Sequence, residues 1–164
     1  MESFLKSLQE KKIQLVVFDF DQTILKEHTG GSIDVSELKQ VQEKISKDAL
    51  TLLNVLPRYS IHVGIASFAQ ESVSVKRETH LAGKHMIQKI LEPYVPHLQT
   101  IPIEAWHGKD KLKHLKNIRC HFPARIRKRH TLLIDDDPKN IETASSHGYL
   151  TCHVKSRQGF SFSN

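Results

Sequence analysis

The residues QLVVFDFDQTIL, from Gln14 to Leu25, join an apolar segment to a pair of carboxylates. The segment from Leu15 to Phe18 has the composition of a buried β-strand, and Asp19 and Asp21 follow it with one phenylalanine between them. Two carboxylates this close repel each other, and a buried carboxylate without a partner is costly. A pair that is kept at the end of a strand therefore indicates a bound cation or a reaction.

The remaining sequence alternates between strand-like and helix-like segments. Short apolar runs predict strands, apolar residues at helical spacing predict helices, and proline or glycine closes several of them. Because proline cannot donate to a strand ladder, the segment 98–106 is expected at an edge of the sheet. Strands are predicted at 13–19, 60–67, 98–106, 130–137 and 149–154, and helices at 2–12, 35–56, 69–78, 83–95, 109–120 and 138–148.

This alternation predicts an α/β fold with a mainly parallel central sheet. Right-handed crossovers place the carboxyl ends of parallel strands along one edge, where such folds bind ligands. The polar residues that follow the strands should therefore meet there. They are Asp19 and Asp21 after the first strand, Ser67 after the second, the lysines that open the helix after the third, and Asp135, Asp136 and Asp137 after the fourth.

Bulk properties indicate one domain of ordinary globular composition. The chain has 164 residues, of which 38% are hydrophobic, and a net charge of +6 that favours anionic partners. The two cysteines lack metal-site spacing and the N-terminus lacks the apolar run of a signal peptide, which predicts a reduced, cytoplasmic or otherwise intracellular setting. No stretch approaches the ~18 apolar residues of a membrane span. We expect a monomer with one domain over 1–154 and a loosely ordered tail over 155–164.

The predicted edge carries the groups that phosphoryl transfer requires. Several carboxylates that meet at one point need a cation, and a set of oxygen ligands favours Mg²⁺. Phosphoryl transfer depends on charge neutralisation and in-line positioning, which a Mg²⁺ ion, a lysine and a hydroxyl group would supply. The sequence therefore predicts a magnesium-dependent phosphoryl-transfer site.

Four short motifs resemble those of the haloacid dehalogenase (HAD) superfamily of phosphohydrolases. DFDQT (19–23) is similar to its D-x-D-x-T signature and GIAS (64–67) to its second motif, while GKDKLKHLK (108–116) can hold its lysine and LLIDDDPKN (132–140) resembles its acidic motif. The resemblance runs from about residue 14 to residue 154. It implies a three-layer, Rossmann-like HAD fold, and the gaps between the motifs are too short for a large cap domain.

The resemblance also implies roles for the polar residues of the first two motifs. Asp19 would be the nucleophile that forms an aspartyl-phosphate, and Asp21 would be the general acid that protonates the leaving oxygen and then activates water. Thr23 would steady the turn, orient Asp21 and contribute to substrate binding. Ser67 would hydrogen-bond the phosphoryl oxygens.

The last two motifs would supply the lysine and the metal site. Lys111 would pair with the phosphate and with Asp19, although Lys109 is an open alternative. Which of Asp135 and Asp136 ligates the metal directly also stays open. The magnesium ligands would be Asp19, the backbone carbonyl of Asp21, Asp136 and Asp135, with Asn140 in a supporting position behind them.

The resemblance implies a phosphomonoester hydrolase, and the small magnesium-dependent phosphatases that the chain resembles include members acting on phosphotyrosine and on phosphosugars. An open site favours a phosphorylated protein or peptide, with phosphotyrosine first because its long side chain reaches a recessed nucleophile. Acidic residues that flank the phosphotyrosine would be favoured by Arg125, Arg127, Lys128 and Arg129 if their loop lay near the site. The alternative is a small phosphometabolite such as a sugar phosphate.

Two further functions compete with hydrolysis. A phosphate-accepting receiver domain uses similar residues, but its acidic pair precedes its lysine, whereas here the acidic cluster follows the lysine. A nucleic-acid-binding module would use the basic run PARIRKRH at 123–130. No aromatic platform accompanies that run, so we expect an exposed loop and no nucleic-acid partner.

Overall fold

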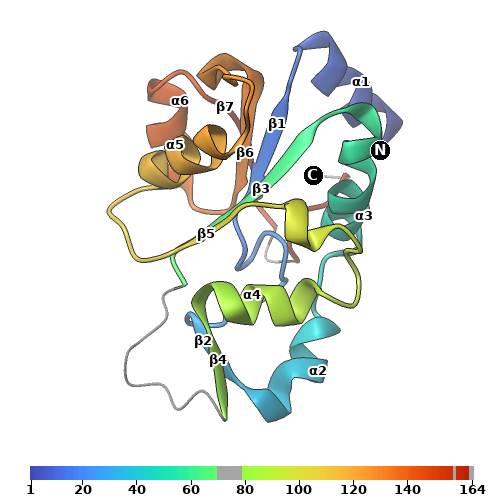
Figure 1. Ribbon diagram of the computed structural model, residues 1–164, viewed down its shortest axis with the longest axis vertical. Coiled ribbons are helices and arrows are strands. Elements are labelled where there is room, and N and C mark those ends of the chain that lie inside the picture. The colour runs from blue at the N-terminus through green and yellow to red at the C-terminus, as the bar shows by residue number, and fades with distance from the viewer. Residues whose placement is uncertain (70–78, 157, 163–164) are drawn as a thin grey trace.

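The computed structural model describes residues 1–69, 79–156 and 158–162, and its centre is a five-stranded parallel sheet (Figure 1). The strand order is β5-β3-β1-β6-β7, so the proline-containing segment does form an edge strand. Each neighbouring pair is parallel, as the alternation of strands and helices predicts. The strands are β1 (Leu15–Phe18), β3 (His62–Ser67), β5 (Ile103–Ala105), β6 (Thr131–Asp135) and β7 (Leu150–His153).

Helices cover both faces of this sheet, which gives the three layers of a Rossmann-like α/β fold. Figure 1 shows α5 and α6 on one side of the sheet and α1 and α3 on the other. The helices are α1 (Glu2–Glu10), α2 (Leu38–Gln42), α3 (Lys47–Val55), α4 (Gly83–Leu91), α5 (Leu112–His121) and α6 (Pro138–Ser146), with short 3-10 turns η1 (Val35–Glu37), η2 (Leu56–Tyr59), η3 (Leu98–Thr100) and η4 (Lys128–His130).

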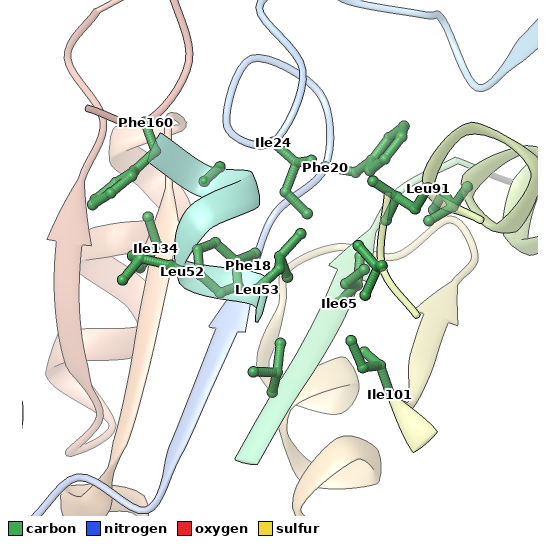
Figure 2. Packing of buried hydrophobic residues seen from close by; sticks show 14 of the residues in the cluster. Phe18, Phe20, Ile24, Leu52, Leu53, Ile65, Leu91, Ile101, Ile134 and Phe160 are labelled. Atoms are coloured by element: carbon green, nitrogen blue, oxygen red, sulfur yellow. The ribbon is translucent and has the colours of Figure 1, made fainter. Parts of the chain in front are cut away.

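Strand β1 lies between two hydrophobic clusters, which explains its uninterrupted apolar sequence. Leu15 and Val17 pack in the cluster with α5 and α6, while Val16 and Phe18 pack in the larger cluster with α1, α3 and α4. Figure 2 shows Phe18 beside the α3 leucines in the larger cluster. All four side chains are fully buried, so β1 is held rigidly below the carboxylates that follow it.

The predicted single helix over 35–56 is wrong, because the chain breaks it between α2 and α3. Ile45 forms an isolated bridge with Leu25, which draws the backbone away from helical geometry. Ser46 is extended at φ −64° and ψ 124°, and its side chain accepts a hydrogen bond from the Ala49 amide as the N-cap of α3. A serine inside an apparently continuous apolar pattern thus marks a new helix start.

A small second sheet, absent from the sequence-based expectation, forms from residues between the sheet strands. Strand β2 (Ser32–Asp34) pairs antiparallel with β4 (His80–Ala82), and α2 and α4 lie against each other beside it. Figure 1 shows these elements together in the lower part of the view. The predicted helix over 69–78 lies outside the described residues, apart from Ala69.

Within the tail that was expected to be loosely ordered, the described residues Gly159 and Phe160 are buried against the body of the protein. Phe160 is 4% exposed, its amide donates to the Thr23 carbonyl at 2.9 Å, and its carbonyl accepts from Ser46 Oγ at 2.5 Å. Its ring meets the ring of Phe4 edge-on at a centroid distance of 5.6 Å. Aromatic burial therefore stabilises a segment whose glycine and serine content predicted mobility. Among the described residues, no helix combines the length and hydrophobicity that crossing a membrane requires.

Candidate functional site

Asp19 and Lys111 form a buried ion pair at the carboxyl end of the sheet. Asp19 follows β1, and its backbone amide donates to the carbonyl of Ile134 in β6. Lys111, at the N-cap of α5, places its Nζ 2.5 Å from Asp19 Oδ1 and 2.6 Å from the Ala66 carbonyl oxygen. Lys111 is 2% exposed, whereas Lys109 is exposed, so the structure brings Lys111 to the carboxylate.

Three carboxylates converge beside this ion pair. One oxygen each from Asp19, Asp135 and Asp136 lies within 4.8 Å of the others. Burial, followed by the charge of Asp19, raises the pKa of Asp135 to about 8 and that of Asp136 to about 6. The cluster therefore holds more negative charge than its surroundings compensate, as expected of a cation site.

The donor set fits Mg²⁺. The converging atoms are all carboxylate oxygens, which hard cations prefer, and Asp135 is completely buried. Asn140 Nδ2 lies 3.2 Å from both carboxylate oxygens of Asp135, and the Asp137 amide donates to Asp135 Oδ1 at 2.9 Å. These contacts hold Asp135 in one orientation, which is the supporting position expected of Asn140. Asp137 itself caps α6 through the Lys139 amide.

Asp21 is held by two residues that the sequence did not single out. His28 Nδ1 lies 2.6 Å from Asp21 Oδ2, and Thr29 Oγ1 lies 3.0 and 3.1 Å from the two carboxylate oxygens. The Thr29 amide donates to Asp21 Oδ2 as well. Burial raises the pKa of Asp21, while the hydrogen bonds from His28 and Thr29 oppose the rise. Asp21 can therefore hold a proton more readily than an exposed aspartate.

Thr23 does not have the position that the resemblance implies. It is completely buried, it does not line the cavity at the site, and its Oγ1 has no hydrogen-bond partner among the described residues. The hydroxyl that orients Asp21 belongs to Thr29 instead. The expected contribution of Thr23 to substrate binding and to the orientation of Asp21 is therefore wrong. The only signal for Thr29 in the sequence was its place in the polar, glycine-containing stretch KEHTGGSID (26–34), which follows the first strand and precedes the helix predicted over 35–56.

The carboxylates open into a cavity of about 560 Å³. Ser67, at the end of β3, lines it and accepts a hydrogen bond from the Ala69 amide at 3.1 Å. Phe68 also lines it, and Lys111 Nζ lies 4.3 Å from the centre of the Phe68 ring. Its other described lining residues include Asp19, Asp21, Gln22, His28, Gly30, Gly31, His107, Asp135, Asp136 and Asn140.

The basic loop 123–130 lies at the opposite end of the sheet from this cavity. It leads through η4 into the first residue of β6, and the carbonyl of His130 accepts from the Gln14 amide before β1 begins. Asp19 and Asp135 stand at the other ends of these two strands. The loop therefore cannot contact the flanking residues of a substrate, and the expected preference for acidic flanks on that ground is wrong.

Comparison with solved structures identifies the fold. The HAD domain of the effector protein Lem4 from Legionella pneumophila matches with a TM-score of 0.60 at 17% identity, covering 92% of this chain and 89% of that one. A predicted HAD-like family hydrolase from Porphyromonas gingivalis matches at 0.50 and 14%, covering 87% and 91%. A scan against models of known families finds no match, and a search of curated protein sequences finds none either.

A third structure similar to this chain carries a substrate name. It is the 3-deoxy-D-manno-octulosonate 8-phosphate phosphatase of Moraxella catarrhalis, described in complex with a magnesium ion, a phosphate ion and a KDO molecule. It matches with a TM-score of 0.50 at 17% identity, covering 85% of this chain and 67% of that one. These matches show that the chain has the HAD fold, as its four motifs predict.

Proposed function

We propose that this protein is a magnesium-dependent phosphomonoester hydrolase that works through an aspartyl-phosphate on Asp19. The observation that carries the proposal is the convergence of the Lys111 ammonium and two further carboxylates on Asp19, at the ligand-binding edge of an α/β sheet. A charged nucleophile, a paired cation and a candidate metal site are the parts that phosphoryl transfer uses. The similarity in fold to HAD hydrolases and phosphatases supports the same reaction class.

In the first step, a carboxylate oxygen of Asp19 attacks the phosphorus of the substrate. The bond from phosphorus to the leaving oxygen breaks, and Asp21 donates its proton to that oxygen, so an alcohol leaves. Lys111 compensates part of the charge on Asp19 and on the phosphoryl oxygens. The raised pKa of Asp21 favours the protonated form that this step needs.

In the second step, water attacks the phosphorus of the aspartyl-phosphate. The Asp21 carboxylate accepts a proton from the water, the bond from phosphorus to Asp19 breaks, and inorganic phosphate leaves. Ser67, at the end of β3 and on the cavity wall, can hydrogen-bond a phosphoryl oxygen during both steps. Asp19, Asp135 and Asp136 would hold Mg²⁺, which supplies Lewis-acid stabilisation of the phosphoryl charge when bound.

For the substrate we favour a small phosphorylated metabolite, such as a sugar phosphate, over phosphotyrosine. One structural relative is named as a sugar-acid phosphate phosphatase, which supports the small-molecule alternative. The cavity volume of about 560 Å³ is also typical of small-ligand sites. The argument for a phosphopeptide loses its electrostatic support because the basic loop lies at the far end of the sheet.

The test is a panel of phosphomonoesters assayed side by side with Mg²⁺, with 4-nitrophenyl phosphate as the general substrate. We expect hydrolysis that stops in excess EDTA, returns with Mg²⁺ and returns poorly with Ca²⁺, whose larger and irregular ligand shell spoils in-line geometry. Sugar phosphates should exceed phosphotyrosyl peptides in kcat/KM. Undiminished turnover in EDTA would refute the metal-dependent mechanism. A higher kcat/KM for phosphotyrosyl peptides would overturn only the choice of substrate and leave the proposed reaction unchanged.

A further inference from the structure

A second cavity, of about 670 Å³, lies outside the candidate catalytic site and shares no lining residue with it. Its walls come from the outer face of α5, the loop 122–128 and the residues that follow α6. Helices α5 and α6 both begin near the catalytic carboxylates, and this cavity reaches toward their other ends. It therefore offers a place for a ligand that does not enter the catalytic cavity.

Basic side chains without neighbouring acidic residues in the sequence are concentrated around this cavity. The segment 112–134 contains seven Lys and Arg residues and neither Asp nor Glu, so it contributes +7 to a net charge of +6, and the rest of the chain sums to −1. Five of the seven line this cavity, namely Lys113, Lys116, Arg119, Arg125 and Lys128. None of the five forms an ion pair with a carboxylate within the described part of the chain.

Arg119 is a fixed cation in the wall of this cavity. Its Nε and Nη2 donate to the Ile126 carbonyl at 2.9 and 2.6 Å, and Nη1 donates to the Tyr149 hydroxyl at 3.2 Å. A guanidinium carries five N–H groups, so two are left over from these contacts for a ligand. Because the side chain is already ordered, an anion that binds it loses little additional conformational entropy.

The floor between these cations is apolar. Leu112, Phe122 and Ile126 contribute hydrocarbon surface, and Lys128 Nζ lies 5.5 Å from the centre of the Tyr149 ring. A cation in the last turn of a helix stabilises the helix C-terminus, which explains Arg119 in α5. It does not explain Lys113 and Lys116 earlier in α5 or the basic residues on the loop. A cavity with an apolar floor and a cationic rim is complementary to a ligand that has an apolar part and an anionic group.

We propose that this second cavity binds a small amphipathic organic anion, which has an aromatic or aliphatic body and a phosphate, sulfonate or carboxylate head. The volume lies within the range of small-ligand sites, and the apolar floor distinguishes it from a flat basic face for a polyanion. The anionic head contacts Arg119, Arg125 and Lys128, and the body covers Phe122 and Ile126. This proposal does not depend on the reaction at Asp19.

The probe is 1-anilinonaphthalene-8-sulfonate, titrated into the folded protein and followed by its fluorescence. We expect saturable binding that the double variant Arg125→Glu/Lys128→Glu weakens by at least about ten-fold. The control, Lys39→Glu/Lys44→Glu, makes the same charge change at exposed positions on and after α2 and should bind as the wild type does. Lys116→Glu provides an independent variant in the same cavity, and the Tm of each variant verifies its folding.

Four outcomes would overturn the proposal. Three of them come from the titrations: absence of saturable binding, unchanged affinity in both cavity variants, and equal losses in the cavity and control doubles. A double-stranded DNA oligomer provides the last arm of the test. If it displaces the probe with a steep salt dependence, the face binds polyanions and the small-ligand proposal is wrong.

Discussion

Lys111 Nζ lies 2.5 Å from Asp19 Oδ1, and the two residues are separated by 92 positions in the sequence. Their side chains are 1% and 11% exposed, so water screens this pair little. Asp19 stands one residue beyond β1 and Lys111 at the start of α5. Their contact therefore depends on the parallel sheet, which brings the ends of separate strands to one edge.

Replacing Lys111 by methionine should lower kcat/KM for 4-nitrophenyl phosphate by roughly 10²–10³, because it removes a preorganised charge at the reacting centre. The matched control is Lys109→Met, which changes an exposed lysine two positions earlier and should leave kcat/KM near the wild-type value. Steady-state kinetics at saturating Mg²⁺ measure both. A large loss in the control and none in Lys111→Met would reverse the assignment.

Asp19→Asn should abolish turnover, because the amide cannot form the acyl-phosphate, while circular dichroism shows a preserved fold. Asp21→Asn should also turn over slowly, yet it should still transfer phosphate to Asp19 from a substrate with a good leaving group. Rapid quench with 4-nitrophenyl phosphate would then show a burst of nitrophenol followed by a slow steady state. Normal turnover in Asp19→Asn would exclude Asp19 as the nucleophile.

Thr29→Val should impair poor leaving groups more than good ones, because Thr29 orients the carboxylic acid that protonates the leaving oxygen. We expect about a ten- to hundred-fold greater loss of kcat with an alkyl phosphate than with 4-nitrophenyl phosphate. Thr23→Val is the isosteric control, since its hydroxyl is buried without a hydrogen-bond partner in the described residues. Equal losses across both leaving groups in Thr29→Val would contradict a role in proton donation.

The metal-free protein should lose stability as pH rises. Asp135 has a pKa of about 8 and Asp136 of about 6 in the folded protein, above the ordinary value of 3.8. Between about pH 4 and about pH 8 the folded state therefore binds more protons than the unfolded state, and the free energy of unfolding falls as the pH rises through this range. Thermal melts in EDTA across this range should show a decreasing Tm.

Added Mg²⁺ should raise the Tm most at the alkaline end, because the ion binds deprotonated carboxylates. Asp135→Asn provides the matched comparison, since it removes the group with the larger pKa shift and should flatten the dependence on pH. A wild-type Tm that rises steadily with pH in EDTA would show that the carboxylate cluster does not behave as a buried, uncompensated site.

Much of the fold and several site residues could be predicted from the sequence, because the signals are local. The apolar runs and the alternation of elements determined a parallel α/β sheet, and the residue types after each strand placed Asp19, Ser67 and Asp135 at one edge. The carboxyl ends of the strands in a parallel sheet lie along one edge, whatever the conformation of the connecting loops. The sequence did not decide whether Lys111 or Lys109 pairs with Asp19, because that depends on which lysine is buried at the start of α5.

Only the tertiary structure decided the contacts whose partners are brought together by the path of the chain. Thr29 rather than Thr23 holds Asp21, because the loop after β1 folds back over the carboxylate. The isolated bridge of Ile45 to Leu25 lies between α2 and α3, and Phe160 packs into the core with the described residues around it. In each case a long-range contact outweighs a weak local propensity, and no local pattern in the sequence specifies the partner.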